Sequence, residues 1–116
     1  MQVYTSNYFK YKGERGVQIS NSKPKDINVS GVLPALFPDW NEVERWNKVK
    51  DNADNQEDWS RFVIKYWDKL DILGIDKMRN LLHDGDVLLC WCNRDTCHRF
   101  VLSTWLNLHG IEVKEW

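Results

Sequence analysis

Apolar residues recur at helical spacing in three parts of the chain. The clearest repeat consists of Trp59, Phe62, Val63, Tyr66, Trp67 and Leu70, which follow the i, i+3, i+4, i+7 template without a gap. This spacing places them on one face of an amphipathic helix. An earlier helix is predicted after Asp39, with Trp40, Val43, Trp46 and Val49 on its apolar face. A later one carries Ile75, Met78, Leu81 and Leu82 and ends at Asp84-Gly85.

Four shorter segments have the patterns of β-strands. They are residues 2–5, 17–20, 87–91 and 111–115. Between the last two, a helix is predicted that begins at about residue 97, continues through residues 100–109 and ends at Gly110. Strand, helix and strand over about thirty residues make a βαβ unit, so we expect the last two strands to be parallel.

The alternation of strands and helices predicts an α/β domain. We expect residues 1–116 to form a single three-layer domain, in which a small, mainly parallel sheet carries helices on its faces. The length of 116 residues suits one domain, and 42% hydrophobic residues suffice for a core. Residues 25–38 are predicted to be a loop, because Pro34 and Pro38 block a long helix.

Composition excludes several classes of function. The formal net charge of −1 gives no basic field, so a nucleic acid is not an expected partner. No apolar run reaches the ~18 residues of a membrane span, and no signal peptide precedes the first strand. An odd number of cysteines, three, argues against a disulfide framework. We therefore expect a cytoplasmic protein without a membrane partner.

All three cysteines lie in residues 87–99, Val-Leu-Leu-Cys-Trp-Cys-Asn-Arg-Asp-Thr-Cys-His-Arg. This stretch begins as a buried strand and breaks into a polar loop, in which Asp95 or Thr96 can cap the following helix. Cys97, His98 and Arg99 are then expected in the first helical turn. Free backbone N–H groups and the helix dipole favour an anion there, and they should also lower the pKa of a thiol.

A strand ending in Leu-Leu-Cys-aromatic, followed by a polar loop and Cys-His-Arg, resembles domain of unknown function 488, a family of small bacterial and phage proteins typified by YeaO-like proteins. Residues 3–9 are similar to that family's first strand and loop. Many members carry Glu two residues after the first cysteine, where this chain has Cys92. The resemblance implies an α/β fold, a bacterial or phage-infected cytoplasm and a site at the Cys-His-Arg turn. It implies no settled activity.

A metal site is the first alternative for this stretch. Cys90, Cys92, Cys97 and His98 supply four potential ligands in a C-x-C-x4-C-H arrangement. Structural zinc usually uses C-x2–4-C spacing, and two cysteines two apart on a strand would bind with a strained bite unless the chain bends. Cys90 is also explained as a buried apolar residue. We therefore expect no tightly bound metal and no cofactor.

Cys92, Cys97 and His98 are the candidate catalytic residues. Cysteine phosphatase and rhodanese loops use Cys-x5-Arg with glycines, whereas six residues separate Cys92 from Arg99 here. Cys97 and His98 are neighbours on a helix and should not face one another. If the protein is an enzyme, we expect it to handle nucleotides or to depend on a cysteine.

The candidate ligand-binding residues are Ser6, Asn7, Ser20, Thr96 and Arg99. The carboxyl ends of parallel strands meet at one edge of a sheet, where ligands bind. Arg99 can clamp a phosphate or a carboxylate, but it can equally pair with a structural carboxylate such as Glu112 or Asp86. His98 can likewise bond only to a backbone carbonyl.

The candidate residues are compatible with two alternative functions. The first is a pocket for a small anionic, phosphate-bearing ligand such as a nucleotide, which the protein binds and on which it can act. The alternative is a non-enzymatic, phage-type interaction module or inhibitor that contacts a protein partner through exposed tryptophans. The positions of Trp40, Trp46 and Trp59 discriminate between them. One exposed patch favours the protein partner, and tryptophans that are buried or cover the Cys-His-Arg turn favour the pocket.

Overall fold

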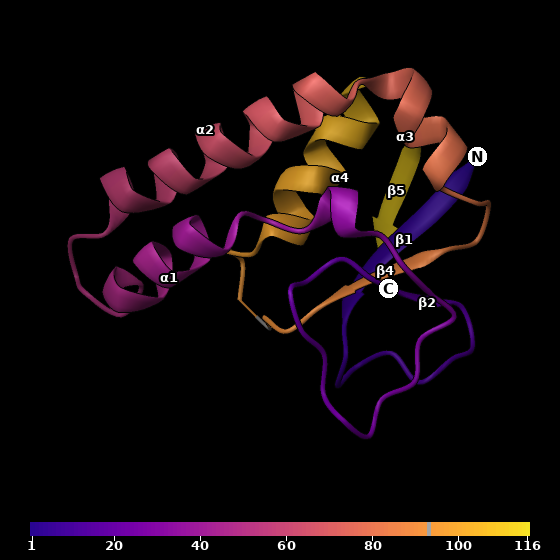
Figure 1. Cartoon of the computed structure of the whole chain (residues 1–116), viewed down its shortest axis with the longest axis horizontal. Helices are drawn as coiled ribbons and strands as arrows, with labels where there is room; N and C mark the ends of the chain where they lie inside the picture. The colour runs from indigo at the N-terminus through magenta and orange to yellow at the C-terminus, as the bar shows by residue number, and fades with distance from the viewer. Residues whose placement is uncertain (93) are drawn as a thin grey trace.

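A five-stranded, all-parallel sheet lies at the centre of the computed structural model, which describes residues 1–92 and 94–116 (Figure 1). The strands follow the order β3-β2-β4-β1-β5. Their bounds are Gln2–Asn7 for β1, Gly16–Gln18 for β2, Gly31–Val32 for β3, Val87–Cys90 for β4 and Glu112–Glu115 for β5. The prediction of an α/β domain with a small parallel sheet is confirmed.

The predicted helices are also present. Their bounds are Trp40–Val49 for α1, Gln56–Leu73 for α2, Ile75–Leu81 for α3 and His98–Leu108 for α4, and a short 3-10 helix, η1, spans Pro34–Leu36. Gly74, with a φ of 80°, ends α2, because a positive φ costs glycine little. In the described part of the chain, no helix is both long enough and apolar enough to span a bilayer.

The start of α4 differs from the prediction by one or two residues. Its N-cap is Cys97, with the extended backbone typical of that position, and neither Asp95 nor Thr96 caps the helix. The Cys97 carbonyl instead accepts the bond from the Phe100 N–H at 3.0 Å. The Cys97 side chain is buried at this N-cap position. His98 and Arg99 still lie in the first turn, as expected.

One face of the sheet packs against the helices. Val3, Leu88 and Val113 on this face share a core with buried residues of all four helices, among them Phe62 and Trp105. Cys90, which alternates with Leu89 along β4, is fully buried, as predicted.

The opposite face of the sheet is covered by loops. Val87 and Leu89 pack there with Tyr8 and Tyr11 from the loop after β1, together with the partly buried Ile27 and Val29. Aromatic and β-branched side chains on these two loops provide the apolar surface that a helix would otherwise supply. The layers are therefore helices, sheet and loops.

The predicted loop over residues 25–38 contains two regular elements. Gly31 and Val32 pair with Val17 and Gln18 as the edge strand β3, and η1 follows. The sequence pattern missed β3 because two residues show no periodicity. The pairing satisfies backbone groups on the edge of β2 that would otherwise stay open.

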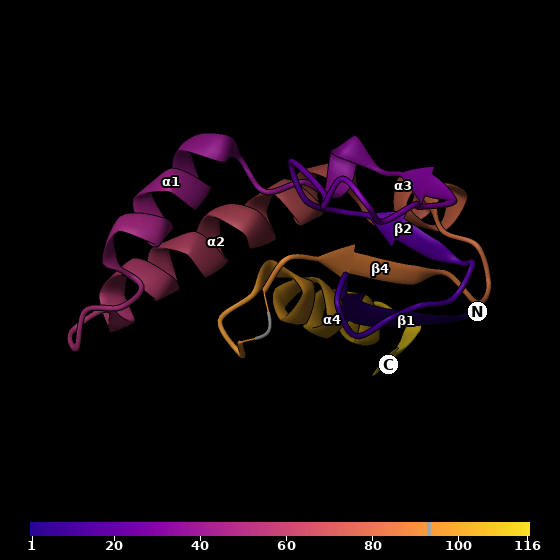
Figure 2. The same ribbon diagram turned by 90° about the horizontal axis from the view of Figure 1, so that it is seen from below.

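The C-terminal βαβ unit has the predicted parallel strands, but they are not neighbours. β1 lies between β4 and β5 and pairs with both. In Figure 2, α1 and α2 run side by side and extend past the sheet on the side to which β4 points. This leaves the carboxyl ends of β2 and β4 facing the two helices.

Arg99 connects α4 to the sheet. Its side chain is 4% exposed, and its Nε donates to Glu115 Oε1 on β5 at 3.0 Å. Its Nη1 donates to Cys90 Sγ at 3.0 Å and also to the Cys92 carbonyl. Arg99 therefore pairs with a structural carboxylate, which was one of the two predicted roles. The partner is Glu115, and neither Glu112 nor Asp86.

Replacement of Arg99 by alanine should destabilise the fold. The variant leaves the Glu115 carboxylate and the Cys92 carbonyl without their buried donor, so we expect the free energy of unfolding to fall by about 2–3 kcal/mol. Arg61→Ala is the matched control, because Arg61 pairs with Glu42 while 46% of its side chain is exposed. That variant should cost less than about 1 kcal/mol. Urea unfolding measures both, and equal losses would contradict the structural role of Arg99.

Candidate functional site

A cavity of about 510 Å³ opens at the carboxyl ends of β2 and β4. This volume lies within the range of roughly 300–1,000 Å³ that is usual for small-molecule sites. Three parts of the chain line it: the loop after β2, the facing sides of α1 and α2, and the segment from β4 to α4. The lining residues are Ser20, Asn21, Ser22, Pro38, Trp40, Val43, Trp46, Asn47, Lys50, Trp59, Phe62, Trp91, Cys92, Arg94, Thr96 and His98.

Aromatic rings form much of the cavity wall. Trp46 and Trp59 have ring centroids 5.0 Å apart, and the Trp59 ring stacks on Phe62 at 5.2 Å. Trp40 and Trp91 are more open, with 54% and 42% of their surfaces exposed. The Trp91 indole N–H donates to the Ser22 carbonyl at 2.8 Å, which fixes its ring against the loop after β2.

Trp40, Trp46 and Trp59 do not form one exposed patch. Trp46 is 7% exposed and Trp59 is half-buried, and all three line the same cavity as Thr96 and His98. This is the arrangement that favours the pocket hypothesis over the protein-interaction hypothesis.

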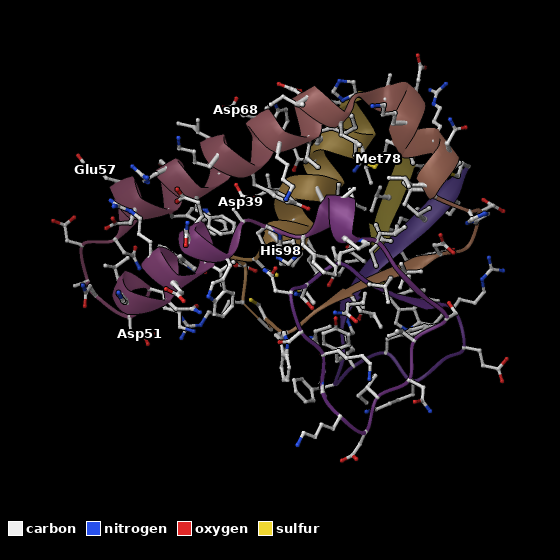
Figure 3. All side chains as sticks on the ribbon, in the orientation of Figure 1. Asp39, Asp51, Glu57, Asp68, Met78 and His98 are labelled. Carbon is white, nitrogen blue, oxygen red and sulfur yellow. The ribbon has the colours of Figure 1, made fainter. Side chains whose placement is uncertain are left out.

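Two cationic side chains reach the cavity. Lys50 is half-buried at the end of α1, and Arg94 lies in the loop before α4. Arg94 Nη2 lies 2.7 Å from Asp51 Oδ1, and this hydrogen bond lowers the pKa of Asp51. Figure 3 shows Asp51 beside the C-terminal end of α1 and His98 at the start of α4.

The three cysteines form a cluster beside the cavity. Their Sγ atoms all lie within 4.8 Å of one another, and those of Cys90 and Cys97 are 2.7 Å apart. Cys90 and Cys97 are buried, whereas Cys92 is half-buried and lines the cavity. The cluster forms because β4 ends at Cys90 and the chain bends at Trp91, which returns the Cys92 side chain toward the core.

The three thiols have different acidities. Hydrogen bonds from the Cys90 and Cys97 thiols lower the pKa of Cys92. Burial raises the pKa of Cys90 to about 11 and also raises that of Cys97. In the absence of a bound cation, desolvation thus favours the protonated thiol at both buried sulfurs.

His98 joins the cysteine cluster to the loop after β2. Its Nε2 lies 2.8 Å from the Ile19 carbonyl oxygen, to which only a protonated nitrogen can donate. Its Nδ1 is 4.0 Å from Cys97 Sγ. Burial lowers the pKa of His98 to about 4, so the imidazole is neutral at pH 7. The predicted bond to a backbone carbonyl is present, and His98 also lines the cavity.

Four of the eight predicted site residues line the cavity: Ser20, Cys92, Thr96 and His98. Ser20 has a structural role as well, because its hydroxyl donates to the Ser22 carbonyl at 2.6 Å and bonds to Tyr8 Oη. Thr96 is half-buried in the turn before α4.

Ser6, Asn7, Cys97 and Arg99 do not line the cavity. Ser6 is fully buried beside Leu89 on the loop-covered face, and its hydroxyl has no hydrogen-bond partner among the described residues. Asn7 Oδ1 accepts from the backbone N–H groups of Phe9 and Lys10, which shapes the loop after β1. The cavity lies at the ends of β2 and β4, whereas β1 lies on the other side of β4. The strand order, which the sequence does not reveal, therefore separates Ser6 and Asn7 from the cavity.

Four further residues that line the cavity had no predicted site role: Trp91, Lys50, Arg94 and Asn47. One observation pointed to the tryptophans. The chain has seven, an unusual number for 116 residues, and four of them line the cavity. Nothing in the sequence distinguished Lys50 and Arg94 from the other surface cations.

Comparisons with known proteins gave no match to a family model, to a curated protein or to a solved structure. The resemblance to domain of unknown function 488 therefore stays a prediction, and any function of this chain must be inferred from its own residues.

Proposed function

We propose that this protein binds a small, phosphate-bearing ligand with a flat aromatic ring, of the nucleotide class, in the cavity at the carboxyl ends of β2 and β4. The observation that carries the proposal is the lining itself. Four tryptophans, two cationic side chains and the first turn of α4 meet around one cavity of about 510 Å³.

The tryptophans suit the flat ring of a base. Every nucleobase presents a π-face, and stacking on an aromatic side chain contributes about 1–3 kcal/mol per base. Trp46 packs on Trp59, which stacks on Phe62, so both tryptophans lose little freedom when a ring stacks on them. Trp40 and Trp91, which are about half exposed, are accessible to a ligand that enters from solvent.

The opposite end of the ligand would carry the negative charge. Thr96 and His98 line the cavity where α4 begins, and the backbone N–H groups of a helix's first turn attract an anion. Lys50 and Arg94 add positive charge. Arg99 was predicted to bind the anion directly. Its guanidinium donates instead to Glu115 and to the Cys92 carbonyl, so in this proposal it stabilises the cavity wall without contacting the ligand.

Trp40→Ala should weaken nucleotide binding, because it removes one of the tryptophan rings on which the base can stack. We expect the dissociation constant for adenosine 5′-monophosphate to rise at least about fivefold, as the loss of about 1 kcal/mol of stacking requires. Isothermal titration calorimetry measures it, with the guanosine, cytidine and uridine monophosphates as further probes. Trp116→Ala is the matched control: Trp116 is 50% exposed and packs on Tyr4 and Tyr11, away from the cavity.

Two outcomes would contradict this assignment. One is that wild-type protein binds none of the four monophosphates with a dissociation constant below about 1 mM, the weak end of ordinary recognition. The other is that Trp40→Ala and Trp116→Ala weaken binding equally.

Lys50→Gln should weaken binding of the nucleotide and leave binding of the nucleoside unchanged. Removal of a half-buried cation near the phosphate should raise the dissociation constant of adenosine 5′-monophosphate roughly threefold or more. That of adenosine, which lacks the phosphate, should not change. Lys48→Gln, an exposed lysine on the same helix and outside the cavity lining, is the control. Equal loss of both ligands would place the phosphate away from Lys50.

A further inference from the structure

We propose that Cys90, Cys92, Cys97 and His98 form a binding site for Zn²⁺, in which three thiolates and His98 Nδ1 are the four ligands. The site would lie in the wall of the cavity, with Cys92 and His98 toward the ligand and Cys90 and Cys97 toward the core. It can be tested separately from the nucleotide proposal, because it uses no tryptophan and neither Lys50 nor Arg94.

The positions of the sulfurs favour a shared metal ion. Two sulfurs bound tetrahedrally to one zinc at about 2.3 Å lie about 3.8 Å apart. All three Sγ atoms here are within 4.8 Å of one another. Cys90 and Cys97 Sγ, at 2.7 Å, would have to separate by about 1 Å to reach this geometry, which a small side-chain rotation provides.

His98 is oriented as a fourth ligand. Its Nε2–H donates to the Ile19 carbonyl oxygen at 2.8 Å, so the neutral ring keeps its lone pair on Nδ1. Nδ1 lies 4.0 Å from Cys97 Sγ, close to the roughly 3.6 Å expected for nitrogen and sulfur on one zinc. A metal-bound histidine almost always donates its other N–H to a carbonyl or a carboxylate, as His98 does.

Arg99 supplies the charge that such a site needs. Three thiolates, one neutral imidazole and Zn²⁺ sum to −1. Arg99 Nη1 donates to Cys90 Sγ at 3.0 Å and to the Cys92 carbonyl, so its guanidinium lies against the anionic cluster. Hydrogen bonds from a cation to a coordinating sulfur are typical of the outer shell of a thiolate site.

The structure removes the sequence argument against zinc. On a straight strand, Cys90 and Cys92 would bind a zinc ion with a strained bite. β4 ends at Cys90 and the chain bends at Trp91, so the two thiols converge without distortion of the strand. A disulfide between Cys90 and Cys97 is the competing use of this cluster. It would leave the Cys92 thiol, whose Sγ lies within 4.8 Å of the other two sulfurs, without a role.

The decisive measurement is the metal content of the full chain, purified under reducing conditions and dialysed with a small excess of Zn²⁺. Native mass spectrometry and elemental analysis should find one zinc per chain. Co²⁺ in its place should give the thiolate-to-cobalt charge-transfer absorption and the visible bands of a tetrahedral ion.

Cys92→Ser is the first test variant, because Cys92 is half-buried and its loss should leave the fold intact by circular dichroism. It should weaken zinc binding by more than roughly 100-fold, beyond the effect of losing an outer-shell partner. His98→Ala should do the same. His83→Ala is the control, since its side chain is 78% exposed and lies outside the cluster. Trp40→Ala should also retain its zinc.

The proposal is overturned if the reduced protein binds no zinc. It is also overturned if the purified chain is lighter by two hydrogens and a Cys90–Cys97 disulfide accounts for the difference. Zinc binding that is equally tight in wild type, Cys92→Ser and His98→Ala would show an adventitious ion. Nucleotide binding is measured separately, with Trp40→Ala, so failure of the zinc site and failure of the nucleotide pocket are distinguishable.

Discussion

The buried guanidinium of Arg99 holds together the part of the molecule on which the candidate site depends. It bonds to the Glu115 carboxylate on β5, to Cys90 Sγ at the end of β4 and to the Cys92 carbonyl in the loop beyond it. A charge this deeply buried is stable only when its donors are satisfied. The bonds therefore fix α4 against two strands at once, and they fix the bend that brings Cys92 back beside Cys90. Without that bend there would be neither a cysteine cluster nor a cavity wall at this place.

Cys92 and His98 belong both to the cavity wall and to the proposed zinc site, and every other residue belongs to only one of the two. The tryptophans, Lys50 and Arg94 face the cavity, whereas Cys90, Cys97 and Arg99 lie behind it. This division gives the two proposals a physical relation. A metal held by the cluster would fix the first turn of α4, whose backbone N–H groups are proposed to face the phosphate. The ligand would then bind to a wall that is already ordered, which reduces the entropy lost on binding.

Several features of the fold could be predicted because local physics specifies them. The apolar stripe of α2 repeats every three to four residues, and the apolar run of β4 is too short for a helix and is bounded by turns. The C-terminal βαβ unit followed from the order of these patterns. Other features have no local pattern. The edge strand β3 is two residues long, and the loops that cover one sheet face are aromatic but aperiodic. Their structure depends on the surface that they cover.

For the candidate site, the sequence by itself determined which chemical groups are present and that they gather near the start of the last helix. Three cysteines, a histidine and an arginine within ten residues could only lie close together. Only the tertiary structure decided which way each side chain points. Burial turned Cys97 and Arg99 inward, the sheet order placed Ser6 and Asn7 beyond β4, and the packing of α1 on α2 brought four distant tryptophans to one cavity. These outcomes depend on contacts between residues far apart in the chain, and no periodicity along the sequence encodes such contacts.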